Sequence, residues 1–117
     1  MGLDADDAPD FALWDANGKT RARLLLHSNG APLFRLWDAD EKPRATVSVL
    51  PDGSPGIDLW DAHERMRASL FLDTHGVPFL ALQDTSEKAR AGLTVRENGA
   101  PLFELRGANG QILFSRP

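Results

Sequence analysis

Residues 32–54 read PLFRLWDADEKPRATVSVLPDGS, and this stretch decides the fold because the chain repeats it at a constant spacing of 23 residues. The copies begin at five prolines: Pro9, Pro32, Pro55, Pro78 and Pro101. A strict period of this length is typical of proteins built from one repeated supersecondary unit. The predicted single domain, 1–117, therefore consists of a leading segment, 1–8, and the repeats 9–31, 32–54, 55–77, 78–100 and 101–117.

Apolar residues alternate with period two inside this stretch. Phe34 and Leu36 precede its first turn, and Ala45, Val47 and Val49 follow it. This spacing indicates half-buried strands rather than a helix. Each repeat is therefore predicted to be one antiparallel hairpin, and the five repeats give ten short strands.

Two kinds of loop alternate along the chain. Between repeats the tips end in glycine, as in 51–53 (PDG), which predicts a three-residue loop with glycine at positive φ. Inside the middle repeats the tips carry glutamate, as in 39–42 (ADEK). Because glutamate adopts positive φ poorly, we expect four-residue loops there.

These loop lengths fix the register of the strands. Leu36 is predicted to lie opposite Ala45, and Trp37 opposite Arg44. Each position then returns to its own equivalent in the next repeat, so the predicted stagger per repeat is zero. Leu3 falls at the same repeat position as the last residue of a second strand, so the leading segment is predicted to contain the end of such a strand.

One face of the predicted sheet consists of aliphatic and phenylalanine side chains, which must be shielded from water. We expect an all-β fold in which the ten strands close into a shallow, low-stagger, pseudo-fivefold ring or barrel, because closure also removes exposed strand edges. One alternative is an open single-layer sheet that buries its apolar face in a dimer, and another is a sheet that folds over on itself. The ring would enclose an axial channel lined by one residue from each repeat: Phe11, Phe34, Ile57, Leu80 and Phe103.

A resemblance supports the ring. The pattern Leu-Trp-Asp-x-x-x-Lys-x-Arg-Ala in 36–45, followed by Asp-Gly-Ser-Pro in 52–55, resembles uncharacterised bacterial proteins with 23-residue β-hairpin repeats. Some proteins of that kind are β-flowers, which are shallow barrels of radiating hairpins. The resemblance covers almost the whole chain and implies a fold, with no activity attached to it.

The composition narrows the classes of function. A formal charge of −4 and a pI near 5.2 argue against a nucleic-acid partner, which normally requires a basic face. The chain has no cysteine, no signal-peptide pattern and no apolar run long enough for a membrane span. A cytoplasmic location is therefore the default expectation.

Tryptophan and arginine form the most conspicuous outward pattern. Trp14, Trp37 and Trp60 occupy one repeat position and are expected to lie opposite three arginines: Arg21, Arg44 and Arg67. The structural interpretation is a cation–π ladder that covers the sheet. The functional interpretation is an aromatic platform for a partner protein, a sugar chain or a single-stranded nucleic acid.

Other polar residues favour structural roles. An aspartate stands six residues after each of the first four repeat prolines, at Asp15, Asp38, Asp61 and Asp84. These aspartates are expected to accept hydrogen bonds from turn amides. The three histidines lack the spacing of zinc ligands, and the turns lack the pattern of a calcium loop. We therefore expect no metal, no cofactor and no enzymatic activity.

The sequence thus predicts a non-enzymatic binding or scaffold module. Its expected partner is a protein bound through the Trp-bearing outer face or the loop rim. Two alternatives stay open: a carrier of a small apolar ligand in the axial channel, and carbohydrate binding by the Trp/Arg ladder.

Overall fold

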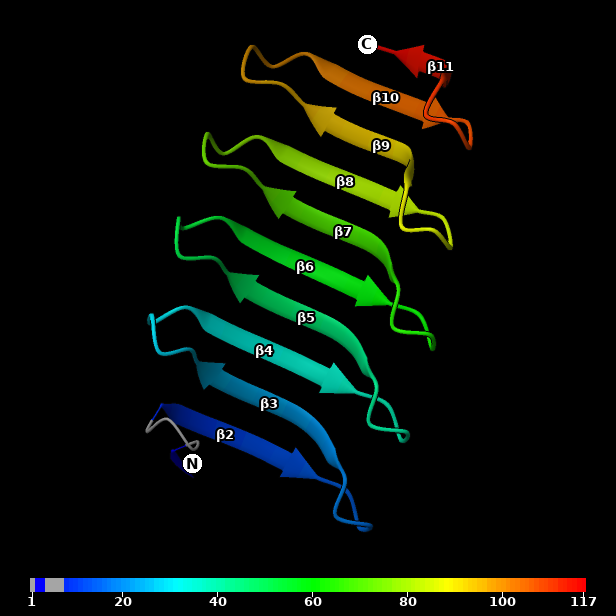
Figure 1. Ribbon diagram of the computed structural model, residues 1–117. Coiled ribbons are helices and arrows are strands. Elements are labelled where there is room, and N and C mark those ends of the chain that lie inside the picture. The colour runs from blue at the N-terminus through cyan, green and yellow to red at the C-terminus, as the bar shows by residue number, and fades with distance from the viewer. Residues whose placement is uncertain (1, 4–7) are drawn as a thin grey trace.

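A computed structural model describes residues 2–3 and 8–117, and these residues form one antiparallel sheet of eleven strands that lie side by side in chain order (Figure 1). The strands are β1 (Gly2–Leu3), β2 (Pro9–Trp14), β3 (Thr20–Leu26), β4 (Pro32–Trp37), β5 (Pro43–Val49), β6 (Pro55–Trp60), β7 (Met66–Leu72), β8 (Pro78–Gln83), β9 (Ala89–Val95), β10 (Pro101–Arg106) and β11 (Ile112–Arg116). The described residues contain no helix, so the all-β prediction is confirmed.

The register between repeats is also confirmed. Val47 lies opposite Ile57 in the β5–β6 pair, and the same relation recurs at each repeat boundary. Leu3 lies opposite Pro9, as Val49 lies opposite Pro55, so β1 occupies the place of the end of a second strand. Every repeat position therefore meets its own equivalent across the sheet, and the stagger per repeat is zero.

The predicted four-residue loops inside the repeats are wrong, because both kinds of loop contain three residues. The Asp38 N–H donates to the Lys42 carbonyl at 3.0 Å, and the Glu41 N–H donates to the Asp38 carbonyl at 3.0 Å. Glu41 has φ 60°, in the left-handed region where Gly53 sits with φ 88°. The carboxylate of Asp38 accepts hydrogen bonds from two loop amides, and these contacts offset the strain of glutamate in this conformation.

A β-bulge compensates for the shorter loop. Leu36 lies opposite Ala45 as predicted, but Trp37 lies opposite Pro43, and Arg44 is the extra residue on the bulged strand. The same register shift recurs inside every other complete hairpin, at Arg21, Arg67, Arg90 and Leu113. Tryptophan and arginine are therefore diagonal neighbours, not the directly opposed pair that the sequence predicted.

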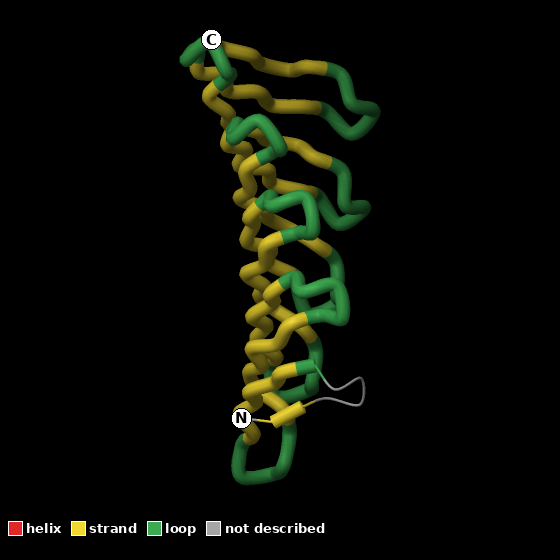
Figure 2. The backbone as a smooth tube through the Cα atoms, turned by 90° about the vertical axis from the view of Figure 1, so that its left-hand side faces the viewer, coloured by secondary structure: helices red, strands yellow, loops and turns green. Residues whose placement is uncertain are grey.

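The sheet is open, so the expected ring is not formed. Figure 2 shows a single layer with β1 and β11 at opposite ends, and its extents are 48 × 30 × 18 Å. The radius of gyration is 17.1 Å, whereas a compact domain of this length has about 13 Å. Every described strand pairs only with its neighbours along the chain. The registers between such neighbours are the same whether the sheet closes into a ring or stays open. The registers that predicted the ring therefore do not require closure.

The two faces of the sheet differ sharply. One face consists of rows of directly opposed apolar residues, such as the row through Leu24, Phe34 and Val47. The other face is polar and more buried, because long side chains lie over it: Thr46 is 3% exposed beneath Arg35, whose Nε donates to its hydroxyl. Within the described chain no large side chain is fully buried, so a conventional core is absent.

Candidate binding surfaces

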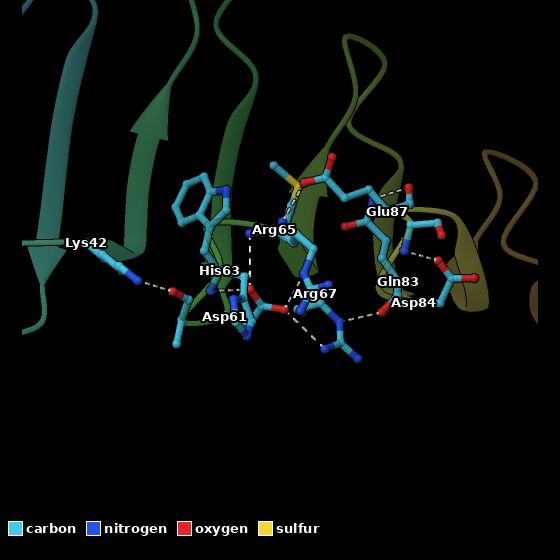
Figure 3. A network of polar contacts seen from close by, with 12 residues as sticks. Lys42, Asp61, His63, Arg65, Arg67, Gln83, Asp84 and Glu87 are labelled. Carbon is cyan, nitrogen blue, oxygen red and sulfur yellow. Dashed lines mark hydrogen bonds and ion pairs between the residues drawn. The ribbon is translucent and has the colours of Figure 1, made fainter. Parts of the chain in front are cut away.

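An aspartate just after the first strand organises the adjacent turn in each of the first four repeats, as Asp61 shows in Figure 3. These four residues are called the shoulder aspartates: Asp15, Asp38, Asp61 and Asp84. The Oδ1 of Asp61 accepts hydrogen bonds from the backbone N–H groups of His63 at 2.9 Å and Arg65 at 3.2 Å. Its Oδ2 accepts from the side chains of Arg65 at 3.0 Å and Arg67 at 3.4 Å. The predicted turn-stabilising role of these aspartates is therefore confirmed at this position.

These hydrogen bonds act on the charge of the carboxylate. Partial burial raises the pKa of Asp61, but hydrogen bonds from the amides of Arg65 and His63 and from the Arg65 side chain outweigh it and lower the pKa to about 2. The Lys42 amide is the largest influence on Asp38, and it lowers the pKa of that carboxyl. The shoulder carboxylates are thus held ionised and are poorly suited to general acid–base chemistry at neutral pH.

The bulge arginines connect neighbouring repeats. Arg44 Nε donates to the Trp60 carbonyl at 2.9 Å, and its second nitrogen contacts Asp38 of its own turn at 3.4 Å. Equivalent contacts to the next repeat are made by Arg21, Arg67 and Arg90. The arginines of the predicted ladder therefore bind backbone and carboxylate groups, and a ligand would have to compete with those contacts.

The three tryptophans lie at one end of the polar face but have different surroundings. Trp14 is 62% exposed, whereas Trp37 and Trp60 are half-buried. The guanidinium carbon of Arg35 lies 6.0 Å from the ring centroids of both Trp37 and Trp60. The cation–π contacts therefore come from an arginine that the sequence analysis did not single out, although it lies on the same outward face as the tryptophans.

A shallow groove of about 500 Å³ runs beside this cluster. Its lining includes Arg35, Asp58 and Trp60 together with the loop that begins at Ser28. The groove is open and its charged groups have opposite signs. Trp37 and Trp60 thus both lie against Arg35. Carbohydrate binding would require an evenly spaced platform of free rings, and the three tryptophans do not form one.

The apolar face is the largest feature that lacks a partner. On β2–β10 it exposes eighteen large apolar side chains, each between 37% and 53% accessible: Phe11, Leu13, Leu24, Leu26, Phe34, Leu36, Val47, Val49, Ile57, Leu59, Leu70, Leu72, Leu80, Leu82, Leu93, Val95, Phe103 and Leu105. The remaining residues in these rows are alanine and proline, so no charge lies among them. An uncharged apolar area of this extent is typical of an interaction surface.

The residues predicted to line an axial channel lie on this face. Phe11, Phe34, Ile57, Leu80 and Phe103 are in one straight row across alternate strands, and each is between 38% and 47% exposed. Because the sheet is open, the row faces outward and the described residues enclose no channel around it. The carrier alternative therefore lacks the cavity on which it depended.

The ionisable side chains suggest no other site. No cluster of three or more histidine, aspartate or glutamate residues in the described chain has the geometry to hold a metal ion. His75 lies 3.8 Å from Glu97, in an exposed contact between two loop tips. In the described part of the chain, no helix is long and apolar enough to cross a membrane.

Comparison with known proteins gives no match, either to a family model or to a curated protein sequence. The resemblance to bacterial hairpin-repeat proteins therefore stays a prediction.

Proposed function

We propose that this chain is a non-enzymatic assembly module that binds through its apolar face, and that the face pairs with the same face of a second copy. The eighteen exposed apolar side chains carry this proposal. The class of function, a non-enzymatic binding or scaffold module, is the one that the sequence predicted. The proposed contact surface is the apolar face, which lies opposite the Trp-bearing face. The proposal also takes up the expected alternative of an open sheet that buries its apolar face in a dimer.

The driving force is burial of the apolar rows. Full burial of a large aliphatic or phenylalanine side chain is worth roughly 1.5–3 kcal/mol, and about half of each side chain is still exposed. Covering that remainder therefore contributes on the order of 1 kcal/mol per side chain. Summed over both copies, this gain is large enough to offset the entropic cost of association.

The shape of the sheet suits an identical partner. The two longer extents of the sheet with its loops are 48 and 30 Å. A sheet of this breadth can offer the roughly 800 Å² per partner that a stable interface needs. Two sheets pack face to face about 10 Å apart when their inner side chains interdigitate. The apolar rows carry no charge that would oppose self-association, and their regular spacing repeats every two strands in both copies.

The experiment measures the mass of the purified chain by size-exclusion chromatography with light scattering. In dilute solution we expect twice the chain mass for the wild type and a single-chain mass for Val47→Lys. Val47 lies at the middle of the apolar face and is 48% exposed, so a lysine there leaves the individual sheet intact. Circular dichroism confirms that the variant keeps its β-sheet signal.

Ser48→Lys is the matched control, because Ser48 is the next residue of β5 and points to the opposite face. This variant should remain a dimer. The proposal is overturned if the wild type is a folded monomer, or if Ser48→Lys dissociates the dimer as fully as Val47→Lys does.

A further inference from the structure

The two end regions of the sheet have unpaired edges that complement each other. On the outer edge of β2, β1 covers Pro9 and Asp10. The rest of that edge, from Phe11 to Trp14, pairs with no described strand. At the other end of the sheet, β11 pairs with Phe103 through Arg106 of β10, and its outer edge is likewise unpaired.

The repeat register shows what each partial strand lacks. Between two complete repeats, one seven-residue strand such as β9 pairs with Pro101 to Leu105 of the next strand, β10. Relative to β9, the strand β11 supplies the equivalents of the first five residues, and β1 supplies the equivalents of the last two. Together β11 and β1 therefore make up one complete strand of the repeat.

The outermost strand β11 carries one charged residue, Arg116 at its end, and its other four residues are uncharged. Edge strands normally carry charged residues that block pairing. Here Leu113 replaces the bulge arginine of the other repeats, and it is 63% exposed beside Ile112, which is 55% exposed. In the repeat, Leu113 is the equivalent of Arg90, and Trp14 is the equivalent of Arg106 on the strand that follows. If β11 paired with β2 in the register of β9 and β10, Trp14 would therefore lie opposite this bulge, and Trp14 is itself 62% exposed.

We infer that β11 of one copy pairs with the open edge of β2 of a second copy, and that β1 of the second copy completes the shared strand. Phe114 would lie opposite Leu13, and Ser115 opposite Ala12, in the register that joins β9 to β10. Leu113 and Trp14 would cover each other where an arginine joins the other repeats. Because the unit is open and β1 and β11 lie at its opposite ends, only a second copy can reach this edge.

This edge contact is separate from the face-to-face contact. It uses backbone hydrogen bonds at the ends of the sheet, whereas the proposed dimer uses side chains of the central rows. The contact is head to tail, so it continues into larger assemblies unless a ring of copies closes. Because it involves only a few residues at each edge, the edge contact should form at a higher protein concentration than the face-to-face dimer. Val47→Lys chains should therefore be monomeric in dilute solution and still form the edge contact when they are concentrated, so the two proposals can fail separately.

Disulfide trapping tests the register directly, because the chain has no cysteine of its own. Ala12→Cys and Ser115→Cys chains are prepared separately, mixed, oxidised gently and analysed by intact mass. We expect the hetero-linked species, at twice the chain mass, to exceed its random statistical share over the two homo-linked species. A statistical mixture, or no linked species, overturns the inference.

Ala81→Cys is the matched control for Ala12→Cys. Ala81 occupies the same repeat position in β8, but both edges of that strand are paired. Mixed with Ser115→Cys chains, it should give no enrichment. A chain with both Ala12→Cys and Ser115→Cys tests whether the sheet closes on itself. An internal disulfide in a species of single-chain mass would show such closure and would contradict pairing with a second copy.

Discussion

The Nε of Arg44 donates a hydrogen bond to the carbonyl oxygen of Trp60 at 2.9 Å, although the two residues belong to different repeats. Arg44 occupies the bulge, and the bulge directs its side chain across the repeat boundary. The contact joins the ends of two hairpins at a point where no loop connects them. The bulge arginine thus serves as a lateral link in a sheet that has no second layer.

Arg44→Ala should lower the free energy of unfolding by about 1 kcal/mol, because it removes one charge-assisted hydrogen bond to the backbone. Arg44→Lys should restore little of this loss, since a single ammonium group cannot reproduce the forked contacts to Trp60 and Asp38. Urea denaturation measures both changes. Arg96→Ala is the control, because the exposed Arg96 side chain has no hydrogen bond or ion pair to another described residue. An equal loss for Arg96→Ala would contradict the proposed link.

Stability should fall in acid through the shoulder aspartates. The pKa of Asp61 is about 2 in the folded state and 3.8 for the ordinary carboxyl, so the folded state favours the ionised form. Its contribution is fully present above about pH 4 and is lost as the pH falls through about 2. The measurement is the urea midpoint as a function of pH. Asp61→Asn should flatten the acid limb of this curve, and an unchanged acid limb would show that other carboxyl groups govern it.

Glu64→Gly should stabilise the fold by about 0.5 kcal/mol. Glu64 has φ 62°, and the left-handed conformation costs an L-residue roughly 1–2 kcal/mol, which exceeds the entropic cost of glycine of roughly 0.5–1 kcal/mol. Thermal unfolding measures the gain. Glu87→Gly is the contrasting variant, since Glu87 has the same backbone conformation but its Oε1 also accepts a hydrogen bond from the Met66 amide at 2.7 Å. Equal gains would mean that this hydrogen bond contributes nothing.

Trp14 should be the most accessible tryptophan in dilute solution. It is 62% exposed, whereas Trp60 is half-buried next to Arg35. Chains that keep one tryptophan, with phenylalanine at the other two positions, allow acrylamide quenching to be compared. Quenching of Trp14 should decrease as the protein concentration rises, because pairing at the β2 edge would cover it. Quenching of Trp60 should stay constant, and a parallel change at both positions would indicate general aggregation.

The strand registers could be predicted from the sequence because alternation and loop length fix them locally. Val47 opposite Ile57 follows from a glycine at the third position of its loop. The length of the loop inside the repeat was harder to predict, because Glu41 occupies a conformation that glutamate normally avoids. Two hydrogen bonds to Asp38 stabilise the three-residue loop. The repeat alignment carried a signal for it, because Gly18 and Gly110 occupy the position of Glu41 in the first and last repeats, with φ 75° and 85°.

The candidate surfaces were predicted less completely. The parity of the outward positions correctly placed Trp37 and Trp60 on one face, but it could not show that Arg35 lies against both rings. The closure of the sheet lay beyond the sequence pattern, because every repeat makes the same contacts with its two neighbours in a ring and in an open sheet. Closure decides whether the apolar face lies inside a ring or on the outside of the sheet. Because closure was expected, the row through Phe34 was predicted to line a channel.

The pairing of each strand only with its chain neighbours determines how the protein responds to force. A pull applied between the two ends of the sheet acts across the strands, so it loads the backbone hydrogen bonds of one hairpin at a time. The molecule should therefore unzip in successive steps at low force instead of resisting as a sheared block. Each step would release one repeat of similar contour length, and the remaining repeats would keep their registers while the sheet shortens.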